Sequence, residues 1–167
     1  MKVISGLVLG GLLLLGGMVL AADLTKDDMP RILKDLKFGN PKARAQAAKD
    51  AGDLGAIRAS DAKEAAPLLL DLAKKDKIAD VRRAAAEAIG KMGTDADKAV
   101  PVLIDCLKND KAMPVKIAAA KSLGQFGSEA KEAIPALQEA AKQDEKQKAN
   151  RPLVQAARQA IKYIRAK

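Results

Sequence analysis

The 167-residue chain contains no histidine and no tryptophan, and it has only one cysteine, one tyrosine and two phenylalanines. The absence of histidine excludes Ser-His-Asp and Cys-His catalysis, the commonest general base and the usual zinc sites. The single cysteine excludes an internal disulfide, and no Gly-rich phosphate loop of the GxxxxGK type occurs. We therefore predict that the chain is not an enzyme and that it uses no metal ion and no cofactor.

The remaining groups that could carry chemistry have a structural explanation in the sequence. Cys106 lies at an apolar position of a helical pattern, which indicates a buried core thiol and not a nucleophile. Acidic pairs occur at Asp27-Asp28, at Asp95 with Asp97 and at Asp144-Glu145. The first two lie where helices are expected to begin, and there carboxylates stabilise free backbone N–H groups.

Few residue types that favour strands are present. Aromatic residues make up 2% of the chain, alanine is abundant and β-branched runs are scarce, so a helical protein is predicted. The charged fraction of 31% and the apolar fraction of 49% are typical of a folded globular chain and not of a disordered one.

The N-terminal segment differs from the rest of the chain. Lys2 precedes an uncharged apolar stretch from Val3 to Leu20, and the small residues Val19 and Ala21 suit a cleavage site. This layout predicts a signal peptide at residues 1–21, cleaved on export to a periplasm or to the outside of the cell. The alternative is an uncleaved membrane anchor. Without residues 1–21 the net charge falls from +9 to +8, no membrane span remains, and anionic partners are favoured in general.

Three segments repeat at intervals of 34 residues: Ser60–Pro67, Thr94–Pro101 and Ser128–Pro135. Each opens with a hydroxyl residue and an acid, which is typical of a helix start, and each proline is expected in the first turn of a helix. An apolar helix should follow each proline.

A second helical pattern follows each of these apolar helices. Val81–Gly93 aligns with Val115–Gly127, and the pattern also occurs earlier as Ala43–Gly55. A fourth copy, Val154–Ile164, has Gln155 where the other copies have a basic residue. The glycines are expected at helix ends, where a left-handed backbone is often needed.

Helix pairs with an opening proline, an aspartate between the helices, a Val-Arg start to the second helix and a closing glycine resemble HEAT repeats. The most similar subtype is the short bacterial HEAT-like repeat related to that of phycobilisome lyases. The resemblance implies an all-α fold, a right-handed α-solenoid of about four HEAT-like helix pairs, because a single pair cannot bury its apolar face alone. The repeats are expected at about residues 25–55, 60–93, 94–127 and 128–166 of a domain spanning residues 22–167.

Basic residues recur on the second helices, which line the concave face in proteins of this resemblance. They are Arg44, Lys49, Arg82, Arg83, Lys91, Lys116, Lys121, Arg158 and Lys162. One interpretation is a cationic stripe for an acidic partner. The other is a structural ladder, in which Arg44, Arg82 and Lys116 pair with inter-helix aspartates such as Asp76 and Asp110 and hold the repeats in register. The resemblance favours the ladder for these three and leaves the other basic residues for solvent or a partner.

The predicted function is a non-catalytic scaffold that binds a protein partner on its concave face, because stacked repeats form a rigid curved surface in advance. The alternative is a charge-driven binder of an anionic polymer or surface, such as a polysaccharide or lipid headgroups. Export and the lack of an aromatic stacking platform argue against nucleic acid.

Overall fold

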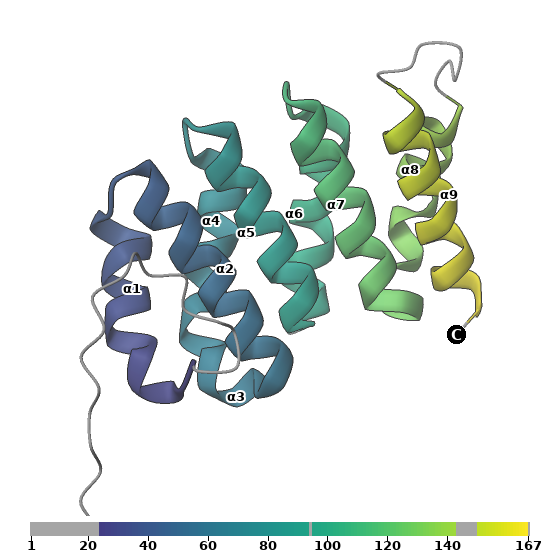
Figure 1. Cartoon of the computed structure of the whole chain (residues 1–167). Coiled ribbons are helices and arrows are strands. Elements are labelled where there is room, and N and C mark those ends of the chain that lie inside the picture. Colours follow the sequence, from purple (N-terminus) through teal and green to yellow (C-terminus); the bar gives the residue numbers. More distant parts are fainter. Residues whose placement is uncertain (1–23, 94, 143–149, 167) are drawn as a thin grey trace, which may run out of the picture.

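The computed structural model describes residues 24–93, 95–142 and 150–166, and within these ranges all regular structure is helical (Figure 1). The first helices of successive pairs are α1 (Met29–Phe38), α4 (Ala66–Lys75), α6 (Ala96–Asn109) and α8 (Ile134–Ala141). The second helices are α2 (Pro41–Ile57), α5 (Ala79–Met92), α7 (Met113–Phe126) and α9 (Arg151–Ala166). Short helical elements come directly before three of the first helices: η2 (Lys26–Asp28) before α1, α3 (Ala59–Ala62) and η3 (Lys63–Ala65) before α4, and η4 (Gly127–Ala133) before α8.

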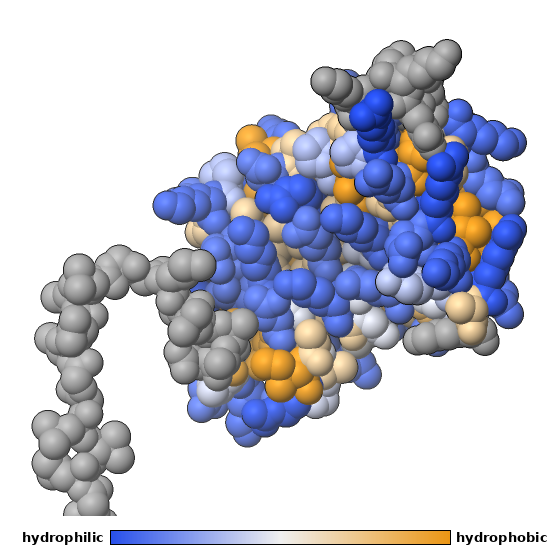
Figure 2. Space-filling view, turned by 45° about the vertical axis from the view of Figure 1, so that its right-hand side comes forward, coloured by the Kyte–Doolittle hydropathy of each residue, from blue (hydrophilic) through white to orange (hydrophobic). Residues whose placement is uncertain are grey.

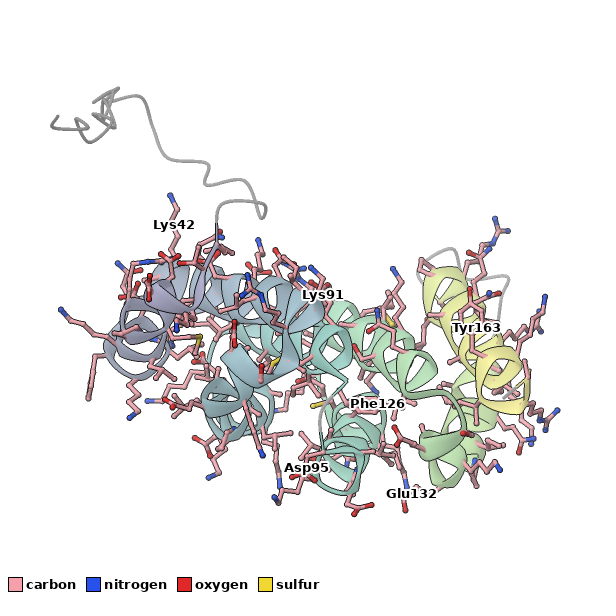
Figure 3. All side chains as sticks on the ribbon, turned by 90° about the horizontal axis from the view of Figure 1, so that it is seen from below. Lys42, Lys91, Asp95, Phe126, Glu132 and Tyr163 are labelled. Atoms are coloured by element: carbon pink, nitrogen blue, oxygen red, sulfur yellow. The ribbon has the colours of Figure 1, made fainter. Side chains whose placement is uncertain are left out.

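The helix pairs stack side by side in chain order and form two layers (Figure 1). The second helices α2, α5, α7 and α9 pack closely on one another, whereas the first helices touch their equivalents at far fewer positions. A stack that is tighter in one layer than in the other must curve towards the tighter layer, so the second helices line the inner face (Figure 3). The predicted all-α solenoid is confirmed.

Glycine and alanine permit the close approach of the second helices. A Cβ atom added to Gly52 would lie 2.8 Å from Cα of Ala88 on the next second helix. A Cβ added to Gly124 would lie 3.0 Å from Cα of Ala160 in the same way. Gly90 is equivalent, since its added Cβ would lie 2.6 Å from Cβ of Ser122. We call Gly52, Gly90 and Gly124 the seam glycines.

Aliphatic side chains from both layers fill the space between them. The largest fully buried ones are Ile32, Leu36, Leu54, Leu69, Leu103, Leu123, Leu137, Leu153 and Ile164. One buried residue of this kind contributes about 1.5–3 kcal/mol relative to an exposed one, so this row is the main source of stability. Because the row crosses every helix pair, each pair is stabilised by its neighbours.

The prolines show where two helix starts were predicted correctly and one was not. Pro67 and Pro135 lie in the first turns of α4 and α8, as predicted. Pro101 lies inside α6, which already begins at Ala96, so the prediction for Pro101 is wrong. The segment before Pro101 is itself α-helical, and the helix tolerates the proline in its second turn.

The closing glycines also divide into two kinds. Gly93 ends α5 with a φ of 58°, the left-handed conformation predicted for a helix end. Gly55, in contrast, is buried inside α2, which continues to Ile57, so the predicted helix end at Gly55 is wrong. An added Cβ at Gly55 would lie 2.5 Å from Cγ of Met92, which shows that this glycine provides space for the next repeat.

The fourth repeat aligns one residue earlier than predicted. Gly124 packs on Ala160 as Gly90 packs on Ser122, which places Leu153 in the position of Val115. Leu153 and Val115 are both fully buried. Val154 therefore takes the place of the basic residue, and the alignment of Gln155 with it is corrected.

Residues 1–23 lie outside the described part of the chain, and with them the predicted signal peptide at residues 1–21 and its cleavage site. Among the described helices, none combines the length and the apolar character needed to cross a membrane.

Candidate functional site

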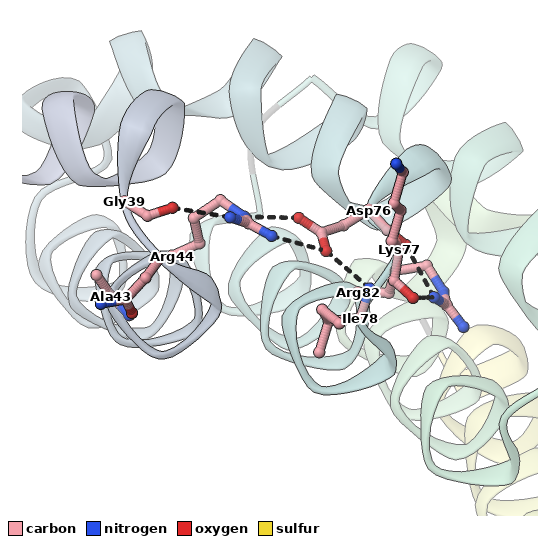
Figure 4. Close-up of polar contacts among 8 residues, drawn as sticks. Gly39, Ala43, Arg44, Asp76, Lys77, Ile78 and Arg82 are labelled. Carbon is pink, nitrogen blue, oxygen red and sulfur yellow. Dashed lines mark hydrogen bonds and ion pairs between the residues drawn. The ribbon is translucent and has the colours of Figure 1, made fainter.

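The first candidate site is the row of charged residues between the repeats. Arg44 at the start of α2 donates to both carboxylate oxygens of Asp76, with distances of 2.7 Å from Nε and 3.2 Å from Nη2 (Figure 4). Its Nη1 also donates to the carbonyl oxygen of Gly39, at 2.8 Å. The Asp76 side chain is 4% exposed and accepts a further hydrogen bond from the backbone N–H of Ile78. Arg44 thus joins the loop of its own repeat to the loop of the next.

The same arrangement recurs one repeat later. Arg82 donates to Asp110 through Nε at 2.6 Å and Nη2 at 2.9 Å, and through Nη1 to the carbonyl oxygen of Asp76 at 2.8 Å. The backbone N–H of Ala112 donates to Asp110 at 2.8 Å. The pKa of Asp110 lies below its ordinary value, because the hydrogen bonds from Arg82 and Ala112 outweigh the opposing effect of burial. Both pairs have the geometry of the structural ladder, so neither arginine is available to a partner.

The residue types of the ladder change towards both ends of the stack, and Asp144, which aligns with Asp76 and Asp110, lies outside the described residues. Gly39 takes the place of Asp76 in the first repeat, since Arg44 bonds its carbonyl oxygen as Arg82 bonds that of Asp76, and it offers no carboxylate. Lys116 takes the place of the arginines in the third repeat, and its Nζ donates to the carbonyl oxygen of Lys108 at 3.0 Å. In the fourth repeat the position is held by Val154, which is buried.

Two further candidate cations of the inner face have carboxylate partners. Arg83 pairs with Glu87 on its own helix at 3.0 Å. Lys91, labelled in Figure 3, pairs with Asp53 of the preceding repeat at 2.6 Å. The inner face of α2 and α5 is therefore mixed in charge and does not form a cationic stripe.

The remaining candidates are exposed. They are Lys49, Lys121, Arg158 and Lys162. Arg158 has polar contacts of its own. For Lys49, Lys121 and Lys162, no ion pair occurs within the described part of the chain. In Figure 2, hydrophilic residues cover most of the face in view, and apolar residues are confined to small separate areas.

A groove of about 500 Å³ lies on the inner face between α7 and α9. Its polar lining consists of Lys121, Gln125, Gln155, Gln159 and Tyr163, and the last of these is 52% exposed. Its apolar lining includes Ile117, Pro152 and Ala156. Of this set, only Lys121 is among the residues predicted from the sequence as candidates.

The glutamines and the tyrosine could not be predicted as site residues, because neutral polar residues on a helix surface carry no signal of their own in the sequence. The repeat register provides the missing signal. Gln155, Gln159 and Tyr163 recur every four residues, so they share one face of α9. That face is opposite the buried Leu153, Ala157 and Ile164.

The groove offers amide donors and acceptors, one aromatic face and one unpaired ammonium group on a surface that is already formed. This is the chemistry of polypeptide recognition, in which amides bond the peptide backbone and the apolar parts bury side chains.

A family model described as HEAT repeats matches residues 29–112 and 95–162. The chain belongs to the HEAT-repeat family. No curated protein matches this HEAT-repeat chain. Among solved structures, it is similar to a chain of the complex of CpcE and CpcF of phycocyanin lyase from Nostoc sp. PCC7120. The TM-score is 0.64 and the identity is 21%, with 81% of this chain and 84% of that chain covered. The similarity to the phycobilisome lyase type of repeat, predicted from the sequence, is thus confirmed at the level of the fold.

The one cysteine of this HEAT-repeat chain lies inside the repeat stack. Cys106 is 4% exposed and donates to the carbonyl oxygen of Ala73 at 3.4 Å. Burial, together with the nearby Asp110 and Asp105, raises the pKa of the thiol to about 11. A thiol that stays protonated and covered is a poor nucleophile at neutral pH.

The acidic pairs of the HEAT-repeat chain have local partners. Thr25 and Asp28 form a reciprocal capping box at the start of η2. Asp95 accepts a hydrogen bond from Lys98 at 2.5 Å. The pair Asp144-Glu145 lies outside the described residues. Within the described ranges, no group of three or more acidic or cysteine residues could hold a metal ion.

Proposed function

We propose that this HEAT-repeat protein is a non-catalytic, exported scaffold that binds a protein partner in the groove between α7 and α9. The observation that supports the proposal is the composition of the groove, in which three glutamine amides, Tyr163 and the unpaired Lys121 surround an apolar floor.

Rigidity favours this surface as a docking site. The groove walls are helices joined by the seam contact of Gly124 with Ala160, so little order has to be gained on binding. Lys121 adds a preference for a partner with an acidic side chain near the middle of its bound segment.

The charges of the inner face favour a protein over an anionic polymer as the occupant of this face. A polyanion would favour a continuous row of free cations, but Arg83 and Lys91 on α5, which separates Lys49 on α2 from Lys121 on α7, are held by Glu87 and Asp53. The similar solved structure is the complex of CpcE and CpcF of phycocyanin lyase, in which two protein chains are assembled. That assembly supports a protein-binding role for the present chain. The chain has no histidine and its cysteine is buried, so it does not offer a His-assisted serine or cysteine nucleophile, which favours the non-catalytic role.

Site-specific photo-crosslinking tests the proposal. A photoreactive amino acid is placed at Gln159 inside the groove or, as the matched control, at Gln138, an exposed glutamine on the outer helix α8. Each protein is expressed in its native host, and crosslinked products are identified by mass spectrometry. We expect one or a few polypeptides to crosslink at Gln159 and not at Gln138, and Lys121→Glu to reduce the yield. Equal crosslinking at both positions would refute the groove as the binding site.

Localisation is tested in the same cells. If the signal peptide at residues 1–21 is functional, the crosslinked protein is recovered from the exported fraction and its N-terminus begins at Ala22. Recovery from the cytoplasm with Met1 present would contradict export.

A further inference from the structure

The two long edges of the solenoid differ in charge. One edge consists of the turns inside the helix pairs, at residues 37–42, 74–80 and 108–112, together with residue 142; we call it the loop edge. Its lysines are Lys37, Lys42, Lys74, Lys75, Lys77, Lys108, Lys111 and Lys142. The acids in the same segments are the ladder residues Asp76 and Asp110, and Asp80 beside Arg83. Lys75 pairs with Asp71 on its own helix, and the other lysines still leave the loop edge with an excess of positive charge.

The opposite edge does not share this excess. It consists of the turns between helix pairs, at residues 25–31, 57–64, 93–98 and 128–132. Its cations are Lys26, Arg31, Arg58, Lys63, Lys98 and Lys131, and its acids are Asp27, Asp28, Asp61, Glu64, Asp95, Asp97, Glu129 and Glu132. Among the turns of the described chain, the positive charge is thus concentrated on the loop edge.

Helix dipoles explain only part of this pattern. Lys74 and Lys108 lie in the last turns of α4 and α6, where a cation is favourable. Lys42 lies at the start of α2, where a cation is unfavourable. Lys77 and Lys111 lie in the turns, 34 residues apart, so the same position is basic in both repeats.

The loop edge also carries exposed apolar side chains. Phe38 is 81% exposed at the end of α1, and Ile78 is 41% exposed at the start of α5. The two turns are connected by hydrogen bonds, because Arg44 bonds Gly39 and Asp76, and Asp76 bonds the N–H of Ile78. Figure 4 shows these contacts and Lys77 beside them. The Arg44–Asp76 contacts thus keep the turns that carry Phe38 and Ile78 next to each other, and lysines of the loop edge surround both side chains.

We propose that the loop edge of the first two repeats binds the surface of a bilayer that contains anionic lipids. Lys37, Lys42 and Lys77 contact lipid phosphates, and Phe38 and Ile78 enter the headgroup region. A soluble polyanion would be attracted by the lysines alone, whereas a bilayer with anionic headgroups also offers an apolar interior to the aromatic ring and the isoleucine on the same edge. The proposal does not depend on the proposed protein-binding function, because the loop edge shares no residue with the groove between α7 and α9.

Vesicle co-sedimentation tests the proposal. The protein is used as residues 22–167, the form expected after removal of the predicted signal peptide, and its folding is checked first by circular dichroism. The vesicles contain phosphatidylglycerol and phosphatidylcholine in equal parts, or phosphatidylcholine alone. We expect binding to the first kind and at least about tenfold weaker binding to the second.

Two pairs of variants separate the lysines from the apolar residues. Lys37, Lys42 and Lys77 are changed together to Gln, with Lys26, Lys63 and Lys131 as a control of equal charge on the opposite edge. The loop-edge variant should lose about 100-fold in partitioning, and the control should lose far less. Phe38→Ser is compared with Ile57→Ser, since Ile57 is 59% exposed on the opposite edge. Phe38→Ser should weaken binding about tenfold, and Ile57→Ser should leave it unchanged.

Three results would overturn the proposal. The first is equal losses from the two lysine variants, which would show that only net charge matters. The second is a Phe38→Ser variant that binds the vesicles as well as the parent, which would show that charge alone holds the protein there and that the apolar side chains do not enter the headgroup region. The third is absence of binding to both kinds of vesicle by a protein whose circular dichroism is that of a folded helical chain.

Discussion

Replacing Asp110 by asparagine tests the ladder directly. Asp110→Asn keeps the size of the side chain and one carbonyl acceptor, but it removes the negative charge that faces Arg82. The Arg82 and Asp110 side chains are only 16% and 7% exposed, so solvent screens this pair much less than a surface pair. The variant leaves an arginine charge in a partly buried position without its partner.

The expected cost follows from the number and burial of the bonds. Removing one partner of a fully buried ion pair costs about 3–5 kcal/mol. Asparagine can still accept from the N–H of Ala112, and Arg82 retains its bond to the carbonyl oxygen of Asp76. We therefore expect Asp110→Asn to lower the free energy of unfolding by about 2–3 kcal/mol. Asp71→Asn serves as the control, because Asp71 and its partner Lys75 are 58% and 72% exposed, and its cost should be about 0–0.5 kcal/mol.

Urea unfolding followed by circular dichroism measures both variants, since urea does not add ionic strength. The difference between parent and Asp110→Asn should depend on pH. The pKa of Asp110 is lower in the folded protein than in the unfolded chain, so its contribution is complete above the unfolded value of about 3.9. The contribution is lost as the pH falls through the lower folded value, and the two proteins should then converge. A loss below about 0.5 kcal/mol at pH 7, equal to that of Asp71→Asn, would refute the ladder as a source of stability.

Three further outcomes are expected from the packing. Gly52→Ala should lower the free energy of unfolding by about 1–3 kcal/mol in urea titrations, because the new methyl group would meet the backbone of Ala88 at 2.8 Å. This loss should exceed the gain from the better helix propensity of alanine. A gain in stability would show that α2 and α5 can move apart. Ala119→Leu should lower the free energy of unfolding by about 1–3 kcal/mol through overpacking, and with it the thermal midpoint, since Ala119 is fully buried. An unchanged midpoint would contradict the repeat alignment. Cys106 should react with a disulfide reagent at pH 8 only after unfolding, because the thiol is buried and, with a pKa of about 11, is almost fully protonated at this pH. Rapid reaction of the native protein would mean that the third repeat opens locally.

The ladder could be predicted from the sequence because its residues recur at fixed positions. An arginine at the start of a second helix and an aspartate before the next one are close in any stack of such pairs, whatever its curvature. The partners of Arg83 and Lys91 could not be predicted in this way. Arg83 pairs along its own helix, whereas Lys91 pairs across the seam, and the choice depends on how closely α2 and α5 approach.

The role of several glycines also depends on the distance between helices, which the sequence does not give. Their positions in the sequence suggested helix ends, and Gly93 fits that prediction. Gly90 and Gly124 are within helices and provide space for the neighbouring helix, which depends on inter-helix distance and not on local backbone preference. The groove between α7 and α9 was missed for a related reason, since its glutamines become a site only when two helices set them side by side.

The ends of the ladder restrict how such a molecule can lengthen by duplication of its gene. A copy of residues 77–110 inserted after Asp110 would bring its own arginine and aspartate, so each ion pair would still be complete. A copy attached before α1 would meet Gly39, which has no carboxylate, and a copy attached after α9 would meet Val154, which has no charge. New repeats are therefore accommodated in the middle of the chain, while its two ends remain the original ones.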